Sequence, residues 1–484
     1  MKLKKVLAIS MVGIMTFSLA GCGSSSATAT TEDSTADTAE STDAAADESA
    51  DATEDSEGLS YANIKLGEDY TDITTTIKLL THRTDMAADD YPGKNWDAYL
   101  AEFNKMYPNI TVEVDPITDY SNEARLRVTS GDWGDIMMID GVDRADLSTY
   151  FISYGSADSV GAVCNYANNW RYDDQIYGIP STANAQGIVY NKKVFEAAGI
   201  TEIPTTTKDF IADLQKIKDN TDAIPLYTNY AAQWTMGAWD SYSGAATADT
   251  EFLNIKLPHM SNPFADPGDG TGLYNVYKVL YDAVSDGLTE DDYTTTDWEG
   301  CKGMINNGEI GTMVLGSWAV SQMKAAGDNA DDIGYMPFPM TYSDGKQYAS
   351  AGPDYNFGIN VNSSADNQAA AMVFVKWMTE ESGFSYNEGG LPLKVGDTDL
   401  PDVYAEFTDV TFIPDEPATT TEEADLLNTL NADSELQFNN GGNEKVMSIV
   451  EHAANGDESF DDIMNDWNTA WSDAQETDGV EVTY

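Results

Sequence analysis

The chain has 484 residues, of which 82 are acidic and 25 are basic, so its formal net charge is −57. A surface with this charge repels nucleic-acid phosphates and anionic lipid headgroups, which excludes a nucleic-acid-binding protein and favours neutral or cationic ligands. The length exceeds what one hydrophobic core supports, so we expect at least two lobes.

The first 21 residues have the pattern of a secretion signal, since Lys2, Lys4 and Lys5 precede an apolar run that ends in "LAGC". A membrane span needs about 20 apolar residues, and this run is shorter. The "LAGC" sequence resembles the lipobox of bacterial lipoproteins, which implies cleavage before Cys22 and a lipid (diacylglyceryl, palmitate-type) anchor on its sulfur. An ordinary signal peptide with an incidental cysteine is the alternative. We expect a lipid-anchored protein on the outer face of the cytoplasmic membrane of a Gram-positive-type bacterium.

An acidic segment, residues 22–58, follows the signal. Positions 23–58 contain eleven acidic residues and no lysine or arginine, and the rest are Ser, Thr, Ala and Gly. Such a segment has no apolar surface to bury, so we predict a disordered tether. An acidic interaction tail is the alternative, although the segment has no aromatic anchor.

Beyond residue 75, short apolar runs alternate with amphipathic stretches, as in a fold where strands alternate with helices. We predict strands at 77–82, 110–115, 134–140, 186–191, 224–229 and 310–316, followed by the apolar segments 333–339 and 355–360. We predict helices at 95–107, 193–199, 204–220, 273–287, 369–381 and 459–475. This alternation implies an α/β fold, with mostly parallel sheets flanked by helices.

The cysteines and histidines give no sign of a metal or cofactor site. Cys164 and Cys301 have no C-x-x-C spacing, and we expect two free thiols, with a disulfide as the alternative. His82, His259 and His452 lie far apart, without the spacing of a zinc site. A calcium site in the Asp-rich loops is the alternative, although these loops lack its ligand spacing. We therefore expect no metal and no cofactor.

Four stretches together resemble the carbohydrate-binding group of extracellular solute-binding proteins, the receptors of ATP-binding cassette importers. They are "TSGDWGDIMMID" (129–140), "YGIPSTANAQGIVYNKKVFEAAGI" (177–200), "NNGEIGTMVLGSWAV" (306–320) and "YNEGGLPLK" (386–394). Gly134 stands where the family usually has proline. The order of the four stretches covers nearly all of the chain after residue 75.

The resemblance implies a two-lobed fold of the type II periplasmic-binding-protein class, with a hinge of crossover strands. It implies a first lobe at 59–184 plus 342–391 and a second lobe at 185–341 plus 392–484. The implied function is a monomeric receptor, not an enzyme, that binds a sugar or oligosaccharide between the lobes and delivers it to the permease of the importer. Clefts between lobes and the carboxyl ends of strands are common ligand sites, which agrees with this expectation.

Neutral sugars are held by flat aromatic faces and by planar hydrogen-bonding groups. The resemblance places Trp318 at the platform of the second lobe, with a core tryptophan as the alternative. Trp234, Trp239 and Asp240 follow the strand at 224–229, and we expect at least one of them to stack on the ligand, with a structural role as the alternative for the other two. The other expected contacts lie in loops after strands or in the crossing segments, where a solvated loop residue is the alternative for each: His82, Arg83, Asp85, Asp140, Asp143, Asn184, Gln186, Asp354, Tyr355 and Asn387.

Two other functions remain open at this point. An extracellular glycoside hydrolase would need two carboxylates that flank one glycosidic bond, and 82 acidic residues leave room for such a pair. No G-x-S-x-G or Walker A motif is present. The second alternative is the same receptor fold with a peptide, a polyamine or another small solute as its ligand.

Overall fold

The computed structural model describes residues 58–88, 91, 93–418, 420–439 and 443–484. The predicted signal peptide, the lipid site at Cys22 and the tether up to residue 57 lie outside the described residues. Within the described ranges, no helix is long and apolar enough to cross a membrane.

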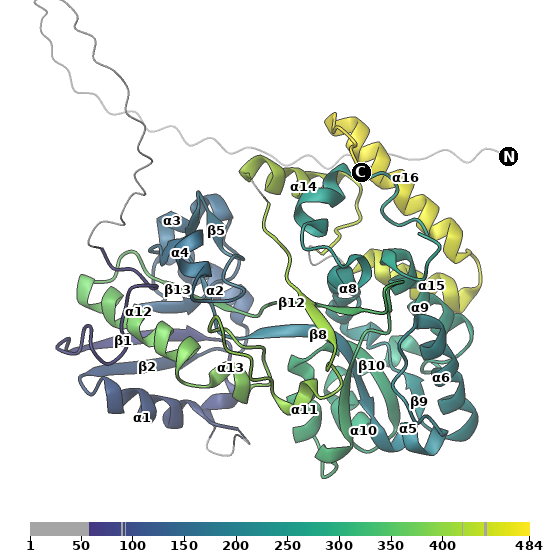
Figure 1. Ribbon diagram of the computed structural model, residues 1–484, viewed down its shortest axis with the longest axis horizontal. Coiled ribbons are helices and arrows are strands. Elements are labelled where there is room, and N and C mark those ends of the chain that lie inside the picture. Colours follow the sequence, from purple (N-terminus) through teal and green to yellow (C-terminus); the bar gives the residue numbers. More distant parts are fainter. Residues whose placement is uncertain (1–57, 89–90, 92, 419, 440–442) are drawn as a thin grey trace, which may run out of the picture. The chain divides into compact units, whose positions relative to one another are not determined.

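The first lobe is built on a five-stranded sheet with the order β2-β1-β3-β13-β7. Strand β1 is parallel to β2 and β3, whereas β13 is antiparallel to β3 and β7. Helices α1, α2 and α12 flank this sheet (Figure 1). The bounds are β1 Thr75–Thr81, β2 Ile110–Pro116, β3 Ile136–Met138, β7 Ile179–Pro180, β13 Asn356–Ile359, α1 Trp96–Met106, α2 Tyr120–Ser130 and α12 Ala365–Glu380.

Helix α1 illustrates how local sequence fixes an element of this lobe. The side chain of Asn95 accepts a hydrogen bond from the backbone N–H of Ala98 and so caps the helix. The helix buries Trp96, Tyr99 and Phe103 on one face. It ends at Met106, before a proline that cannot continue it.

A small satellite sheet, with the order β4-β6-β5, extends the first lobe beside the short helices α3 and α4. Two of its strands flank a turn at Asp173 and Asp174, both of which have positive φ. The bounds are β4 Gly155–Ser156, β5 Arg171–Tyr172, β6 Gln175–Ile176, α3 Leu147–Tyr150 and α4 Ala157–Gly161.

The second lobe is built on a sheet with the order β14-β12-β8-β10-β9, in which β11 also pairs with β8. Its central strand, β8, is almost wholly buried, as expected for a strand covered on both faces. The bounds are β8 Ala183–Asn191, β9 Ile224–Leu226, β10 Ile310–Gly316, β11 Ile333–Pro337, β12 Gln347–Pro353 and β14 Val410–Ile413.

Helices of the second lobe cover both faces of this sheet (Figure 1). Those that follow residue 420 form the C-terminal part of the lobe. The bounds are α5 Lys192–Ala198, α6 Thr207–Asn220, α7 Trp234–Gly237, α8 Ser243–Thr247, α9 Gly272–Ser285, α10 Trp298–Asn306, α11 Trp318–Ala325, α14 Thr421–Asp433, α15 Glu444–Asn455 and α16 Phe460–Asp478.

Three segments cross between the two sheets. The first joins β7 to β8 through Ser181 and Thr182, and the second joins β12 to β13 through Asp354 and Tyr355. The third leaves α13 (Phe384–Asn387), and its Leu391 donates a backbone hydrogen bond to the carbonyl of Ala183 in β8.

One expected boundary needs correction. The first lobe is predicted to resume at residue 342, but β12 pairs with β14 and β8 in the second sheet. The crossing therefore follows Pro353. The segment "QYASAGP" has little apolar periodicity, so its sequence does not indicate which sheet it joins. Only its pairing partners determine this.

The two expected free cysteines are confirmed. Cys164 and Cys301 are buried and free, and they lie in the cores of different lobes. Burial raises the pKa of each thiol to about 12.

Candidate functional site

The crossing segments bring one edge of each sheet together, where edge means a side at which strands begin or end and not an outermost strand. In the first sheet this edge carries the carboxyl ends of β1 and β3 and the end of β7 that leads into the first crossing. In the second sheet it carries the carboxyl ends of β9, β10, β12 and β14, because these four strands run parallel to one another. Ligands of α/β proteins bind outside the carboxyl ends of strands, so this shared edge is the candidate site.

A cavity of about 840 Å³ lies at this edge and draws residues from both lobes. The first lobe contributes segments 142–145 and 166–174, and the second lobe contributes segments within 414–439. Between them lie Ala351, Gly352 and Pro353 at the end of β12. A volume of this size is ordinary for a site that encloses a small organic ligand.

The lining of the cavity is rich in amides and aromatic rings. Amides pair with adjacent sugar hydroxyls as both donor and acceptor, and aromatic rings pack against the C–H faces of sugars. Within the described residues, the side chains of Asn168, Asn169 and Asn428 make no hydrogen bond, which leaves them available to a ligand. The lining amides are Asn168, Asn169, Asn254, Asn428, Asn431 and Asn439, and the lining aromatics are Tyr166, Trp170, Tyr172 and Phe438.

Two charged side chains face this cavity without an ion-pair partner among the described residues. Arg144 belongs to the first lobe and Asp415 to the second. Both are open to the cavity, yet the surrounding protein removes part of their hydration. This desolvation lowers the pKa of Arg144 and raises the pKa of Asp415 to about 6. Each group is therefore well placed to gain from a polar ligand.

A polar cluster links the second crossing to the end of β10. The side-chain amide of Asn184 donates to the carboxylate of Asp354 at 3.4 Å, and its carbonyl accepts from Ser317 at 3.2 Å. Burial raises the pKa of Asp354, although the backbone N–H of Tyr355 and the Asn184 amide partly offset this effect. Ser317 immediately precedes Trp318, so the cluster fixes the start of α11.

Three tryptophans gather at the ends of β9 and β10. The ring of Trp234 lies 4.9 Å from that of Trp298 and 5.7 Å from that of Trp318. Trp234 is 43% exposed, which is unusual for so large an apolar side chain. These three residues, the tryptophan cluster, do not line the 840 Å³ cavity but lie at the same sheet edge, on the β9 side of the crossings.

On the first lobe, the loop after β1 forms a second polar and aromatic group. The ring of His82 stacks on Tyr355 at 4.1 Å, and its Nδ1 is buried without a partner among the described residues. Burial lowers the pKa of His82 to about 4, so the ring is neutral at physiological pH. A buried nitrogen without a partner is a natural position for a ligand hydroxyl.

Arg83 and Asp85 are engaged with the protein itself. The Arg83 guanidinium donates two hydrogen bonds of 2.9 Å to Asp85 and a further one of 2.8 Å to Glu388, which lies in the third crossing. The hydroxyl of Tyr91 also contacts Glu388. This network ties the first loop to the third crossing.

Several expected contacts are placed elsewhere by the fold. Trp239 and Asp240 are 2% and 1% exposed in the core of the second lobe, so we correct them to structural residues. Both lie in a short helical turn, Ala238–Tyr242, that follows β9 and packs into the core. The sequence pattern of the strand does not predict this turn. Asn387 donates to the Tyr99 hydroxyl at 2.9 Å, and Gln186 pairs with Gly316 within the second sheet.

Of the predicted contacts, Asp143 lines the cavity, and Asp140 lies nearby in the same loop, where it accepts from Ser121. Sequence reasoning missed Trp170, Arg144, Asp415 and the amides. Arg144 could have been found beside Asp143, but "NNWRYDD" and "PDEP" read as ordinary turns. Trp170 and Asp415, in these two turns, line the cavity only because loops from distant parts of the chain lie opposite them.

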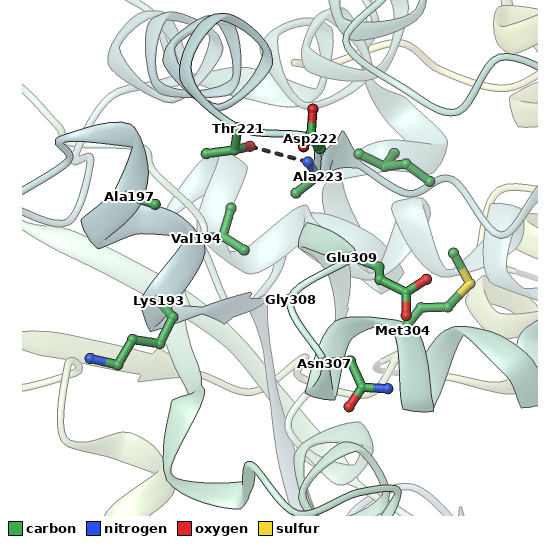
Figure 2. A pocket seen from close by; sticks show the side chains of 11 residues that line it. Lys193, Val194, Ala197, Thr221, Asp222, Ala223, Met304, Asn307, Gly308 and Glu309 are labelled. Atoms are coloured by element: carbon green, nitrogen blue, oxygen red, sulfur yellow. Dashed lines mark hydrogen bonds between the residues drawn. The ribbon is translucent and has the colours of Figure 1, made fainter.

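A second hollow, of about 490 Å³, lies at the opposite edge of the second sheet. It is lined by residues around Lys193, Thr221 and Glu309 (Figure 2). Thr221 accepts a hydrogen bond from the backbone N–H of Ala223 at 3.2 Å. Every lining residue belongs to the second lobe.

Residues 87–383 match the family of bacterial extracellular solute-binding proteins, over more than half of the chain. The chain belongs to this family. Among curated relatives, the multiple sugar-binding protein of Streptococcus mutans is 25% identical over 316 residues, which cover 61% of this chain and 71% of the relative. The maltotriose-binding protein of Pyrococcus abyssi is 22% identical over 289 residues, which cover 57% and 58% of the two chains.

Solved structures extend this similarity. A manno-oligosaccharide-specific solute-binding protein of Bifidobacterium animalis subsp. lactis, in complex with mannotriose, is 52% identical with a TM-score of 0.80. An ABC-transporter binding protein of the same organism, in complex with mannobiose, is also 52% identical with a TM-score of 0.80. The alignments cover 87% of this chain and 99% of each of those chains. The expected two-lobed α/β fold is confirmed.

Proposed function

We propose that this protein is an extracellular receptor for manno-oligosaccharides that delivers them to an ATP-binding cassette importer. One observation carries the proposal: a cavity of about 840 Å³ that is lined from both lobes by amides and aromatic rings, in a chain 52% identical to a protein in complex with mannotriose. The chemistry of the lining suits a neutral ligand with many hydroxyls. The strongly acidic chain as a whole disfavours an anionic ligand.

The ligand acts by favouring a closed arrangement of the lobes. A ligand shifts an equilibrium between two states only if it binds one of them better. A sugar that contacts segment 166–174 in the first lobe and segment 414–439 in the second has this differential affinity, because both contacts require the lobes to be close. The crossings at Ser181–Thr182 and Asp354–Tyr355 are the natural hinge positions.

We further propose that the sugar extends beyond the cavity toward the tryptophan cluster. Along the sheet order β14-β12-β8-β10-β9, the cavity lies beside β14 and β12, and Trp234 and Trp318 lie beside β10 and β9. Asn184 and Asp354, which are hydrogen-bonded to each other, lie between them. A mannobiose would occupy the cavity. A longer oligosaccharide would reach the indole of Trp318.

The lipid anchor on Cys22 and the acidic tether belong to the same proposal. Two acyl chains hold a protein on a membrane firmly, whereas one does not. The anchor would keep a monomeric receptor close to the permease on the outer face of the membrane. Labelling of the full-length protein with a fatty-acid analogue, lost in Cys22→Ala, tests this step.

The hydrolase alternative is not retained, because the family and the similar structures are described as binding proteins. The receptor and hydrolase functions also predict different fates for the ligand. A receptor releases mannotriose intact, whereas a hydrolase would generate new reducing ends during incubation.

The proposal is tested by a thermal-shift screen of mannobiose and mannotriose against maltotriose, cellotriose and xylotriose. A ligand at 100 times its dissociation constant raises the free energy of unfolding by about 2.7 kcal/mol. We expect this stabilisation for the manno-oligosaccharides, and compaction in small-angle scattering with the same sugars. Stabilisation by another sugar alone would overturn the choice of mannose, and stabilisation by none would overturn the receptor.

A further inference from the structure

A buried charged network lies directly behind one wall of the cavity. The ammonium of Lys445, on α15, forms an ion pair with the carboxylate of Asp240. The Tyr277 hydroxyl, on α9, donates to the same carboxylate at 2.6 Å. The side chains of Lys445 and Asp240 are 3% and 1% exposed, so water does not satisfy these groups. The ammonium also lies over the rings of Tyr277, Phe438 and Trp467.

This network reaches the cavity through one backbone hydrogen bond. The second carboxylate oxygen of Asp240 accepts from the backbone N–H of Asn439 at 2.9 Å. Asn439 is exposed and lines the cavity, and its backbone has a positive φ of 49°. Asparagine is among the few non-glycine residues that adopt this left-handed conformation readily. The bond from Asp240 holds the backbone of Asn439 in it.

The preceding residue is held in a similar way. The Asn431 side chain accepts from the backbone N–H of Phe438 at 2.8 Å and donates to its carbonyl at 3.0 Å. The Phe438 ring is buried 5.2 Å from the Lys445 ammonium and 6.1 Å from the ring of Phe264. Two buried polar side chains therefore fix two consecutive residues of the cavity wall.

Stability alone gives little reason to bury this ion pair. Desolvation of two charges offsets much of their attraction, and well-packed apolar replacements of buried ion pairs are often neutral or stabilising. An apolar pair, however, would leave the Asn439 N–H without an acceptor. The carboxylate thus has a specific task that a hydrophobic side chain does not perform.

We propose that Asp240 is a positioning residue for the sugar: through its bond to the Asn439 backbone it holds the Asn439 side-chain amide in the orientation that contacts a manno-oligosaccharide. Lys445 forms the ion pair with this carboxylate inside the core. The inference rests on the proposed function of the cavity. It gives Asp240 an indirect role in place of the direct ligand contact expected from the sequence.

The experiment compares two double variants that both remove the charge pair. Asp240→Asn with Lys445→Met keeps a side-chain oxygen that can accept from Asn439, whereas Asp240→Leu with Lys445→Met removes the acceptor. Mannotriose affinity is measured by titration calorimetry, and the melting temperature of each ligand-free variant is measured beside it. We expect the variant with leucine to bind about tenfold more weakly than the variant with asparagine, whatever their melting temperatures. Equal affinities would overturn the proposal.

A single variant keeps the test decisive if a double variant does not fold. Asn439→Ala removes the amide and leaves the buried network in place, and Asn465→Ala removes an exposed amide of α16 outside the cavity as the matched control. We expect about tenfold weaker mannotriose binding in Asn439→Ala and none of this loss in the control. Unchanged affinity in Asn439→Ala would overturn the inference. Failure of the unmodified protein to bind any manno-oligosaccharide would instead overturn the proposed function.

Discussion

The second sheet has a hollow at each of its two edges, and the two hollows differ in which parts of the chain enclose them. The larger, of about 840 Å³, lies beside the carboxyl ends of β12 and β14 and draws residues from both lobes. The smaller, of about 490 Å³, lies beside the amino ends of β9 and β10 and draws residues from the second lobe alone. Only a ligand in the larger hollow has contacts that depend on lobe closure.

The chemistry of the two hollows differs as well. The larger contains six asparagines and four aromatic rings, together with Arg144 and Asp415, neither of which has an ion-pair partner in the part of the chain that the structure describes. The smaller has Lys193, which is paired with Glu196, and the described residues that line it include no aromatic side chain. A receptor site therefore needs both a closable position and a lining that suits sugars. The following predictions test whether this contrast is the relevant one.

The largest effect is expected from Trp170 in the larger hollow. Trp170→Ala removes an aromatic face, and truncation of a well-packed aromatic contact costs about 2 kcal/mol. This corresponds to roughly 30-fold weaker binding of both mannobiose and mannotriose. Titration calorimetry measures the loss, with Tyr484→Ala as an exposed aromatic control. Binding equal to that of the unmodified protein would place the sugar elsewhere.

A change in the tryptophan cluster should act on longer ligands only. Trp318→Ala is expected to weaken mannotetraose about fivefold, because stacking on one ring is worth about 0.5–1.5 kcal/mol. Mannobiose, which we place in the cavity, should lose less than about threefold. The two affinities are compared in the same calorimeter. An equal loss for both sugars would mean that the cluster and the cavity are not separate subsites.

A smaller effect is expected from pH, through Asp415. Its pKa in the folded protein is raised to about 6, so the carboxylate gains a proton as the pH falls from 7 to 5. Hydroxyls of a sugar donate to the charged carboxylate, so affinity should fall severalfold over this window. His82 stays neutral there, because its pKa is about 4. Asp415→Asn should bind mannotriose with an affinity that no longer changes between pH 7 and 5.

The same shift has an opposite consequence for the ligand-free protein. A raised folded-state pKa means that the folded protein binds this proton more tightly than the unfolded chain does. The contribution of Asp415 to the free energy of unfolding therefore becomes more favourable as pH falls through about 6. Denaturant titrations at pH 7 and 5, each compared with Asp415→Asn, measure this contribution. The raised pKa of Asp415 would be contradicted if lowering the pH from 7 to 5 reduced the free energy of unfolding more in the unmodified protein than in Asp415→Asn.

The smallest effect is expected in the smaller hollow. Glu309→Ala changes the lining of the smaller hollow and leaves the residues between the two lobes unchanged. Mannotriose affinity should therefore stay within about twofold of that of the unmodified protein, which corresponds to less than about 0.5 kcal/mol. A larger change would show that the edge at the amino ends of β9 and β10 communicates with the ligand. The contrast between the two hollows would then be wrong.

Most of the fold could be predicted from periodicity. The strands β1, β2 and β10 and the helices α1, α6 and α16 lie within a few residues of the predicted ranges. The helices each bury one face with a regular spacing, and β10 is a continuous run of buried residues. The segment that became β12 could not be placed in this way. Its sheet is decided by pairing with β8 and β14, which are far away in the chain.

The site was harder to predict. Asp143, predicted because it follows a buried strand, lines the cavity. Trp234 and Trp318, predicted because they follow β9 and β10, lie close to each other, and their contact with a ligand stays a prediction. Of the three residues expected after β9, Trp239 and Asp240 are structural, because a short helical turn after β9 carries them into the core. Trp170 and Asp415 carry no local signal, since their surroundings come from other segments.

The sequence by itself determined the class of the protein: a charge that disfavours nucleic acid, alternating strands and helices, and four motifs in the order of a solute-binding receptor. These features are local or additive, so a linear reading captures them. The tertiary structure alone decided which loops enclose the cavity and which carboxylates are buried. Such facts depend on contacts between residues hundreds of positions apart, and no local pattern of side chains encodes them.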